Sequence, residues 1–278
     1  MSGALPQGAC DTHCHVFGPQ SRFSYAPNRT YTPDEAPREA LFALHRAHGF
    51  DRAVIVQPAV HGFDNRVTLD AIAASGNAYR GVALVPEDVT PAALEALHAG
   101  GMRGVRFNFL SHIALPPPER TVRRVAELVA PLGWHIVLHL TPPDLATAWN
   151  YLKPLALPFI VDHMARISTA DGLDQPGFRL LLDMATDARC WVKISGADRA
   201  SAAGAPFDDA LPFCRALLEA APERILWGTD WPHPNIKGSV PRESDLLSLL
   251  RKAAPEPALL RRVLVDNPNR LYRFDVAL

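Results

Sequence analysis

Residues 135–163 read HIVLHLTPPDLATAWNYLKPLALPFIVDH and place one amphipathic stretch between two short apolar runs. The runs His135–Leu140 and Phe159–Asp162 are rich in apolar and β-branched residues, which is typical of strands buried on both faces. The stretch Pro143–Leu152 between them predicts a helix. A strand, a helix and a second strand in this order form the unit from which parallel sheets are built.

The same alternation continues in both directions along the chain and predicts eight buried strands. These strands are Cys10–Val16, Arg52–Gln57, Gly81–Val85, Gly104–Phe109, His135–Leu140, Phe159–Asp162, Cys190–Ile194 and Arg224–Gly228. Helical spacing predicts helices at Pro37–His48, Thr121–Leu132, Pro143–Leu152, Gly177–Ala185, Asp208–Ala221, Ser244–Ala253 and Pro257–Val265. Residues 19–34, rich in proline, tyrosine and arginine, predict a long loop after the first strand.

Eight strands that alternate with helices over 278 residues predict an α/β fold, a single (β/α)8 TIM barrel domain spanning residues 1–278. Such barrels need about 250 residues, so the length leaves little room for a second domain. The alternative is a doubly wound open sheet. No GxGxxG follows any predicted strand, so the commonest fingerprint of that alternative is missing.

Composition excludes several functional classes. The chain has 28 Lys and Arg against 29 Asp and Glu, and this balance provides no electrostatic footprint for nucleic acid or an anionic membrane. No apolar run reaches the roughly 18 residues of a membrane span, and the first residues, MSGALPQGACDTH, show no secretion signal. The four cysteines include no CxxC, which predicts reduced thiols and a cytoplasmic protein.

Polar side chains gather where the predicted strands end. The first strand ends in a HxH pair, His13 and His15, whose side chains share one face because a strand has a period of two. His139 ends the fifth strand, His163 follows the sixth, and Asp230 follows the eighth. Barrel enzymes take their catalytic groups from these strand ends. A lone histidine here is more often a hydrogen-bonded structural residue, but the conjunction predicts one convergent active site.

Imidazole nitrogen and carboxylate oxygen, the donor types gathered at this rim, are the usual ligands of a zinc ion that keeps an open position for water. The sequence therefore predicts a bound divalent ion at this rim. Zn²⁺ is the first choice, whereas another divalent ion or no metal stays open at this point.

Three blocks of sequence carry a resemblance to a known family. They are DTHCHVFG (11–18), VDHMAR (161–166) and LWGTDWPHPN (226–235), and the blocks HGFDN (61–65), GGMRGVRFNFL (100–110) and DNPNRLY (266–272) extend the likeness over nearly the whole chain. The chain resembles the amidohydrolase superfamily, in the branch that contains 2-pyrone-4,6-dicarboxylate lactonase and 4-sulfomuconolactone hydrolase. The resemblance implies a barrel that hydrolyses a lactone ring bearing acidic groups.

The resemblance also implies roles for individual residues. His13, His15 and His163 match histidines around the scissile carbonyl, and Asp230 matches the general base that takes a proton from the attacking water. Arg106 matches an arginine that binds a substrate carboxylate. Three further residues are expected at the substrate: His233 and Asn235 near the bound ring, and Arg199 as a second anion-binding arginine.

Two positions depart from the pyrone lactonase. His139 replaces a tyrosine, and His112 replaces a second substrate-binding arginine. A histidine on the fifth strand completes the ligand set of metal-dependent amidohydrolases, so we expect His13, His15, His139 and Asp230 to hold one metal ion. The absence of an arginine at His112 favours a sulfomuconolactone over the pyrone dicarboxylate as the substrate.

We therefore expect an enzyme that opens a small anionic lactone in the bacterial degradation of aromatic compounds, with a homo-oligomer possible. One alternative is a metal-free sugar-acid lactonase or lactone isomerase of the same branch. A second is a metal-dependent nonoxidative decarboxylase, which also uses a HxH and a strand-eight aspartate. A third is a non-catalytic barrel that only binds a small acid.

Overall fold

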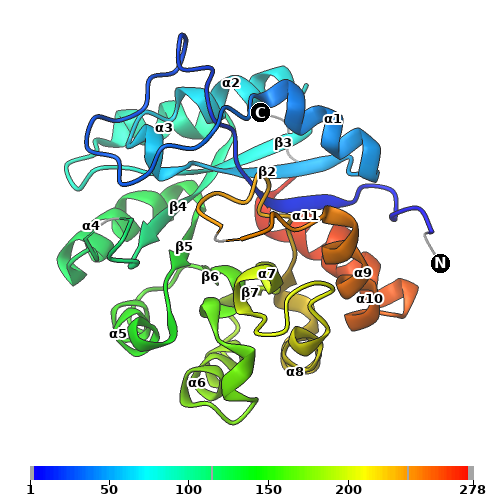
Figure 1. Cartoon of the computed structure of the whole chain (residues 1–278). Helices are drawn as coiled ribbons and strands as arrows, with labels where there is room; N and C mark the ends of the chain where they lie inside the picture. Colours follow the sequence, from blue (N-terminus) through cyan, green and yellow to red (C-terminus); the bar gives the residue numbers. More distant parts are fainter. Residues whose placement is uncertain (1–2, 114, 237, 275–278) are drawn as a thin grey trace.

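The computed structural model describes residues 3–113, 115–236 and 238–274, and within them eight parallel strands form one sheet in the order β1 to β8. The strands are β1 Cys10–Cys14, β2 Arg52–Val56, β3 Tyr79–Ala83, β4 Met102–Asn108, β5 His135–His139, β6 Phe159–Val161, β7 Cys190–Lys193 and β8 Ile225–Leu226. Helices surround this sheet on all sides (Figure 1). The predicted (β/α)8 barrel is confirmed.

The helices follow the strands in the expected alternation. They are α1 Arg38–His48, α2 Arg66–Ala74, α3 Pro91–Ala99, α4 Glu119–Val129, α5 Pro142–Leu152, α6 Pro176–Ala185, α7 Ala197–Ala200, α8 Leu211–Ala220, α9 Glu243–Ala253, α10 Pro257–Arg261 and α11 Asn267–Tyr272. The sequence prediction missed α2, α3, α7 and α11. The helix α3 carried a readable signal, since Thr90 caps it by accepting from the Ala93 N–H and Pro91 occupies its first turn.

Some boundaries also differ from the prediction. The third strand begins two residues earlier than expected, at Tyr79, and the eighth is only Ile225–Leu226. The predicted helix Pro257–Val265 consists of α10 and a π-helical turn, Arg262–Asp266. The predicted strand Arg224–Gly228 is longer than β8, because the chain leaves the sheet after Leu226.

The ring of strands closes through a seam between β1 and the segment after β8. Backbone hydrogen bonds run from Thr12 N to Trp227 O (3.0 Å), from His15 N to Trp231 O (2.8 Å) and from Asp230 N to His13 O (2.8 Å). Gly228 permits this approach, because a Cβ there would lie 2.4 Å from the backbone nitrogen of His13. The seam thus places the HxH segment directly beside Asp230.

Asp11 fastens the seam from the outer side of the barrel. Its Oδ1 accepts from the backbone N–H groups of His13 and Thr229, both at 3.0 Å, and its Oδ2 accepts from the Thr229 hydroxyl at 2.6 Å. A register shift in β1 between Asp11 and Cys14 re-aims the chain here. Asp11 consequently contacts His45 on α1, at 3.2 Å, although it is two residues from His13.

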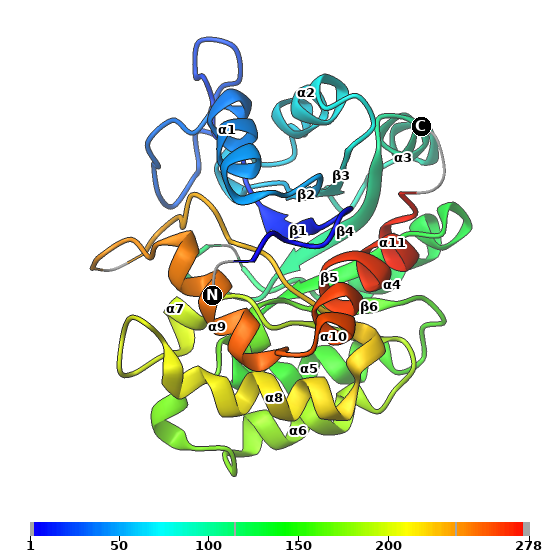
Figure 2. The ribbon, with the colours of Figure 1, turned by 90° about the vertical axis from the view of Figure 1, so that its right-hand side faces the viewer.

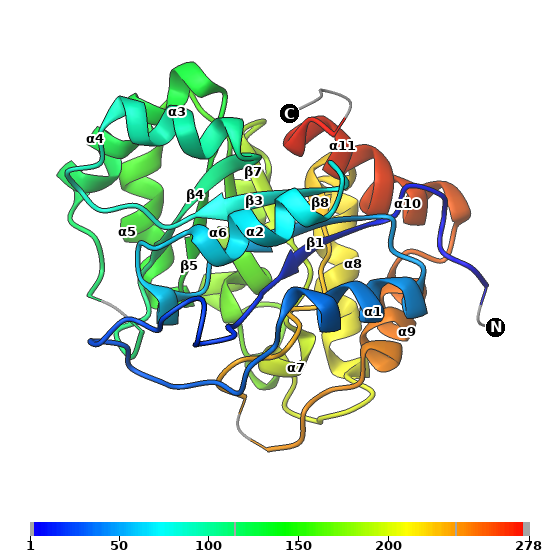
Figure 3. The same cartoon turned by 90° about the horizontal axis from the view of Figure 1, so that it is seen from above.

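A buried apolar cluster lies inside the ring of strands. Cys10, Val54, Val56, Val82, Val137, Ile160, Trp191, Leu226, Leu271 and Tyr272 form one buried cluster inside the ring. A larger buried cluster lies between the outer faces of the strands and the helices. The long loop after β1 and the segment after β8 extend from the same end of the barrel (Figures 2 and 3). Among the described residues, no helix has the length and apolar character needed to cross a bilayer.

Candidate active site

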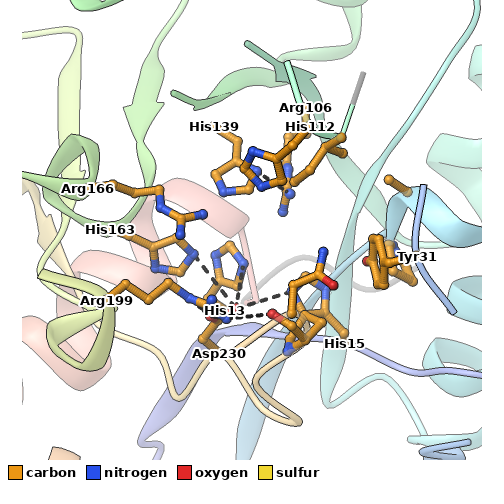
Figure 4. Close-up of a pocket in the computed structure, with 15 residues that line it drawn as sticks. His13, His15, Tyr31, Arg106, His112, His139, His163, Arg166, Arg199 and Asp230 are labelled. Atoms are coloured by element: carbon orange, nitrogen blue, oxygen red, sulfur yellow. Dashed lines mark hydrogen bonds and ion pairs between the residues drawn. The ribbon is translucent and has the colours of Figure 1, made fainter. Parts of the chain in front are cut away.

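The carboxylate of Asp230 lies at the centre of the predicted site, and three imidazoles face it (Figure 4). Its Oδ1 is 3.3 Å from His15 Nε2, 3.6 Å from His13 Nε2 and 3.7 Å from His163 Nε2. All four residues are buried. The structure thus brings together the HxH pair, the histidine after β6 and the aspartate after β8.

In His15 and His163, the ring nitrogen that faces away from Asp230, Nδ1, has a hydrogen-bond partner. His15 Nδ1 lies 2.7 Å from the carbonyl oxygen of Val56, which can only accept a hydrogen bond. His15 Nε2 lies 3.3 Å from Asp230 Oδ1, within hydrogen-bond distance, so this ring stands between two hydrogen-bond acceptors. His163 Nδ1 lies 2.9 Å from the Ser195 hydroxyl. Burial lowers the pKa of His163 to about 4, so this imidazole is neutral near pH 7.

Arg199 binds the other oxygen of Asp230. Its Nε and Nη2 lie 2.8 and 2.7 Å from Oδ2, and Nη2 also donates to the carbonyl oxygen of Pro234. Burial raises the pKa of Asp230, but Arg199 and the histidines outweigh burial and hold this pKa well below its usual value. Asp230 is therefore a carboxylate throughout the neutral range. Arg199, predicted to bind the substrate, is engaged with the predicted base instead.

Arg106 and His139 form a second group on the opposite side of the pocket. The guanidinium Nη2 of Arg106 donates to Asn108 Oδ1 (3.2 Å) and to His139 Nδ1 (2.7 Å). Burial and this guanidinium lower the pKa of His139 well below its usual value. The Nη1 atom of Arg106 is buried without a hydrogen-bond partner among the described residues and lies 3.9 Å from Asp162.

Left-handed backbone recurs at the site. His163, Arg166, Asp230 and Asn235 have φ values of 51°, 53°, 63° and 59°. Residues other than glycine rarely adopt this conformation, and each such residue costs about 1–3 kcal/mol unless the surroundings enforce it. The turn after β6 uses this conformation to direct both His163 and Arg166 into the pocket (Figure 4).

Gly196 provides the space for His163. A Cβ at Gly196 would lie 2.7 Å from the Cβ of His163, and its φ of 72° is also left-handed. We expect Gly196→Ala to displace His163 and lower kcat by about 100-fold, since small misplacements of reacting groups have effects of this size. Steady-state kinetics on the lactone substrate measures the change.

The matched control is Gly204→Ala. Gly204 has a φ of 75°, but a Cβ there meets nothing within 4 Å. Gly204→Ala therefore places an alanine in a left-handed conformation, as Gly196→Ala does, but without a steric clash. Equal losses of kcat in the two variants would attribute the effect to backbone strain and not to the position of His163.

The pocket collects most of the predicted residues. It is lined by His13, His15, Tyr31, Pro58, Ala59, Arg106, His112, Ile113, His139, His163, Arg166, Arg199, Asp230, Pro234 and Asn235. His233 does not line it, because its Nε2 faces Glu243 Oε1 at 3.3 Å. Among the described residues, His139 belongs to none of the three groups with metal-binding geometry, which are His13, His15 and Asp230, then His13, Asp162 and His163, and, outside the pocket, Asp11, Cys14 and His45.

Sequence reasoning missed two lining residues, Tyr31 and Arg166. Tyr31 lies on the loop after β1, and burial raises its pKa to about 12. No hydrogen bond or ion pair joins the Arg166 guanidinium to another described residue. The tyrosine-rich composition of the loop and the arginine that ends VDHMAR were the available signals. Neither signal gives the direction of the side chain.

A larger cavity of about 810 Å³ adjoins the pocket. Tyr31, Ala59, Arg106 and Ile113 line both spaces, and residues 24–31 form one wall of the larger one. A ligand bound at Asp230 therefore has open volume on the side of the loop after β1.

Comparisons with known proteins identify the family of the chain. The family model described as amidohydrolase matches residues 10–274. The chain is 42% identical to a 2-pyrone-4,6-dicarboxylate hydrolase of Comamonas testosteroni, with 96% of this chain and 91% of the relative covered. It is also 42% identical to a 4-sulfomuconolactone hydrolase of Rhizobium radiobacter, with 98% and 92% covered.

A solved structure extends the likeness to three dimensions. The crystal structure of a putative 2-pyrone-4,6-dicarboxylic acid hydrolase from Pseudomonas putida superposes with a TM-score of 0.86 at 32% identity, covering 98% of this chain and 100% of that one. Family match, sequence identity over nearly full length and shared architecture lead to one conclusion. The chain belongs to the amidohydrolase family.

Proposed function

We propose that the protein is a lactonase that adds water to a small anionic lactone. The observation that carries this proposal is the convergence of three imidazole Nε2 atoms on Asp230 Oδ1, at 3.3–3.7 Å, in a pocket that also holds arginines. An ionised carboxylate next to the neutral imidazole of His163 suits base-assisted attack of water on a carbonyl. The lactone hydrolases among its relatives support the same reaction class.

Two arginines are available to bind the acidic groups of the substrate. Arg106 has a buried Nη1 atom without a hydrogen-bond partner among the described residues, and Arg166 has a guanidinium without a hydrogen bond or ion pair there. A planar guanidinium binds carboxylate or sulfonate through paired hydrogen bonds. We therefore assign anion binding to Arg106 and Arg166. Arg199 orients Asp230 in this proposal.

The reaction follows from these positions. Asp230 accepts a proton from water as the water oxygen bonds to the lactone carbonyl carbon. A protonated Nε2 of His13 or His163 donates to the carbonyl oxygen, whose negative charge grows in the transition state. The ring C–O bond then breaks, and Asp230 returns its proton to the leaving oxygen. The products are a carboxylate and a hydroxyl or enol on the same opened chain.

A divalent metal ion fits part of this site. The ligand atoms of His13, His15 and Asp230 lie within 4.8 Å of one another, and His15 Nε2 faces Asp230 Oδ1 at 3.3 Å. His13 Nε2 is buried without a hydrogen-bond partner among the described residues. These three residues would hold the ion. When bound, a zinc ion would polarise the carbonyl and lower the pKa of the attacking water.

Metal binding is tested with two histidine variants. After incubation with zinc and gel filtration, wild-type protein is expected to retain about one equivalent, and His15→Ala is expected to lose it because a ligand is removed. Elemental analysis gives the count. His139→Ala tests the ligand role predicted from the sequence: full zinc content in that variant would remove His139 from the ligand set, and loss would restore it.

The proposed activity is tested directly with purified protein. We expect hydrolysis of 4-sulfomuconolactone, with slower opening of 2-pyrone-4,6-dicarboxylate because His112 stands where the pyrone lactonase has an arginine. Chromatographic detection of the ring-opened acid follows both reactions. Absence of turnover with both lactones, in the presence and absence of zinc, would contradict the proposal. The cytoplasmic location and the homo-oligomer stay predictions from the sequence.

A further inference from the structure

Lys193 is a fully buried cation directly behind the active site, and the proposed reaction makes no use of it. It is the last residue of β7 and shares a strand face with Trp191, which belongs to the cluster inside the barrel. Its exposed fraction is 0%. Its Nζ lies 3.1 Å from His13 Nδ1 and 3.1 Å from Asp162 Oδ1.

His13 Nδ1 therefore has two neighbours of opposite kind. Protonated Lys193 can only donate a hydrogen bond, whereas the carboxylate of Asp162, 3.3 Å away, can only accept one. A hydrogen bond from Lys193 to His13 Nδ1 requires a lone pair on this nitrogen, which only the neutral ring has. A neutral ring holds one proton, and Nδ1 can either accept from Lys193 or donate to Asp162.

The geometry favours the contact with the lysine. The Lys193 Nζ to His13 Nδ1 contact has hydrogen-bond geometry, whereas neither oxygen of Asp162 has a hydrogen-bond partner among the described residues. When Nδ1 accepts from Lys193, the ring proton lies on Nε2. The N–H of Nε2 then points into the pocket, where the proposed lactone carbonyl lies.

A purely structural role explains this lysine poorly. Replacing a buried ion pair with apolar groups of similar size is often neutral or stabilising, so the fold gains little from a charge in this position. Asp162 also has a second cation nearby, since Arg106 Nη1 lies 3.9 Å from its Oδ2. The distinctive feature of Lys193 is its contact with an active-site imidazole.

We propose that Lys193 is a positioning residue that selects the tautomer of His13. With Lys193 present, His13 offers a hydrogen-bond donor to the carbonyl oxygen. Without it, His13 gives its ring proton to Asp162 and presents the Nε2 lone pair, which is the form that binds a metal ion. The catalytic meaning of this choice rests on the proposed lactonase function, but the tautomer itself does not.

The wild-type protein provides the first test. Nitrogen-15 NMR of metal-free protein at pH 8, with His13→Gln used to assign the ring signals, distinguishes a protonated Nε2 from one with a lone pair. We expect the protonated form for His13 Nε2. A lone pair on His13 Nε2 in wild-type protein would overturn the proposal, and this measurement requires no variant at Lys193.

The second test is zinc affinity, measured by chelator competition on metal-stripped protein. Lys193→Met is expected to bind zinc about 10-fold more tightly than wild type, because outer contacts of a ligand histidine change metal affinity by about 10–100-fold. Asp162→Asn removes the competing acceptor and is expected to bind zinc no more tightly than wild type. Equal affinities of Lys193→Met and wild type would contradict the proposal. If neither lactone is a substrate, the NMR and zinc-affinity measurements still test the tautomer of His13.

Discussion

Asp230→Asn is expected to lower kcat for lactone opening by about 10³-fold, the middle of the range for removal of a general base. Asparagine has the shape of aspartate, so the seam and the neighbouring imidazoles can keep their places, but an amide cannot take a proton from water. The pKa of Asp230 lies well below its usual value because Arg199 and the histidines outweigh burial, so the wild-type base is ionised at every pH near neutrality.

For Asp230→Asn, ligand affinity is measured separately from kcat, so an effect on the chemical step can be distinguished from an effect on binding. Ligand affinity, measured by calorimetry with the ring-opened product, is expected to change little in Asp230→Asn, because Arg106 and Arg166 are intact. Asp245→Asn is the matched control, since this carboxylate on α9 pairs with Arg242, the residue before the helix. Turnover of Asp230→Asn at the wild-type rate would remove Asp230 as the base.

Arg106→Met is expected to lower kcat/KM by about 100-fold. A charge-assisted pair with a substrate anion contributes roughly 1.5–3 kcal/mol, and the lost contacts to His139 and Asn108 add to the cost. Most of the change should be in KM, because the guanidinium binds the ground state and the transition state alike.

Arg166→Met is the informative companion to this variant. Its guanidinium has no hydrogen bond or ion pair with another described residue, so its removal breaks no such contact in the free protein. A loss of affinity with Arg166→Met that is confined to lactones with two acidic groups would support binding of the second group there. Unchanged KM in both arginine variants would refute the assignment of anion binding to this pair.

The fold and the centre of the site were predictable because their signals are local. A strand buried on both faces gives a continuous apolar run, and a polar residue that ends the run lies at the barrel rim, as His139 does. The HxH pair and Asp230 needed only the period of a strand and the position of strand ends. Their closeness follows from the closure of the ring through the seam.

The partners of these residues were not predictable, because irregular backbone sets them. Arg199 reaches Asp230 from α7, a helix of four residues that begins after a left-handed glycine. Arg166 enters the pocket from a left-handed turn, which no periodicity reveals. In the sequence, nothing distinguishes Lys193 from other strand residues. Only the folded barrel brings its Nζ next to His13.

Because β8 is short, the sheet has a junction at which local opening is easier than elsewhere. The pairing of β7 with β8 joins two residue pairs, whereas the pairing of β4 with β5 joins five. Amide hydrogens at such a junction exchange through small openings that leave the rest of the molecule folded. An opening at the β7–β8 junction would release the segment that carries Asp230 from one of its two neighbouring strands without melting the barrel. We therefore expect the site to lose activity under mild stress before the whole molecule unfolds.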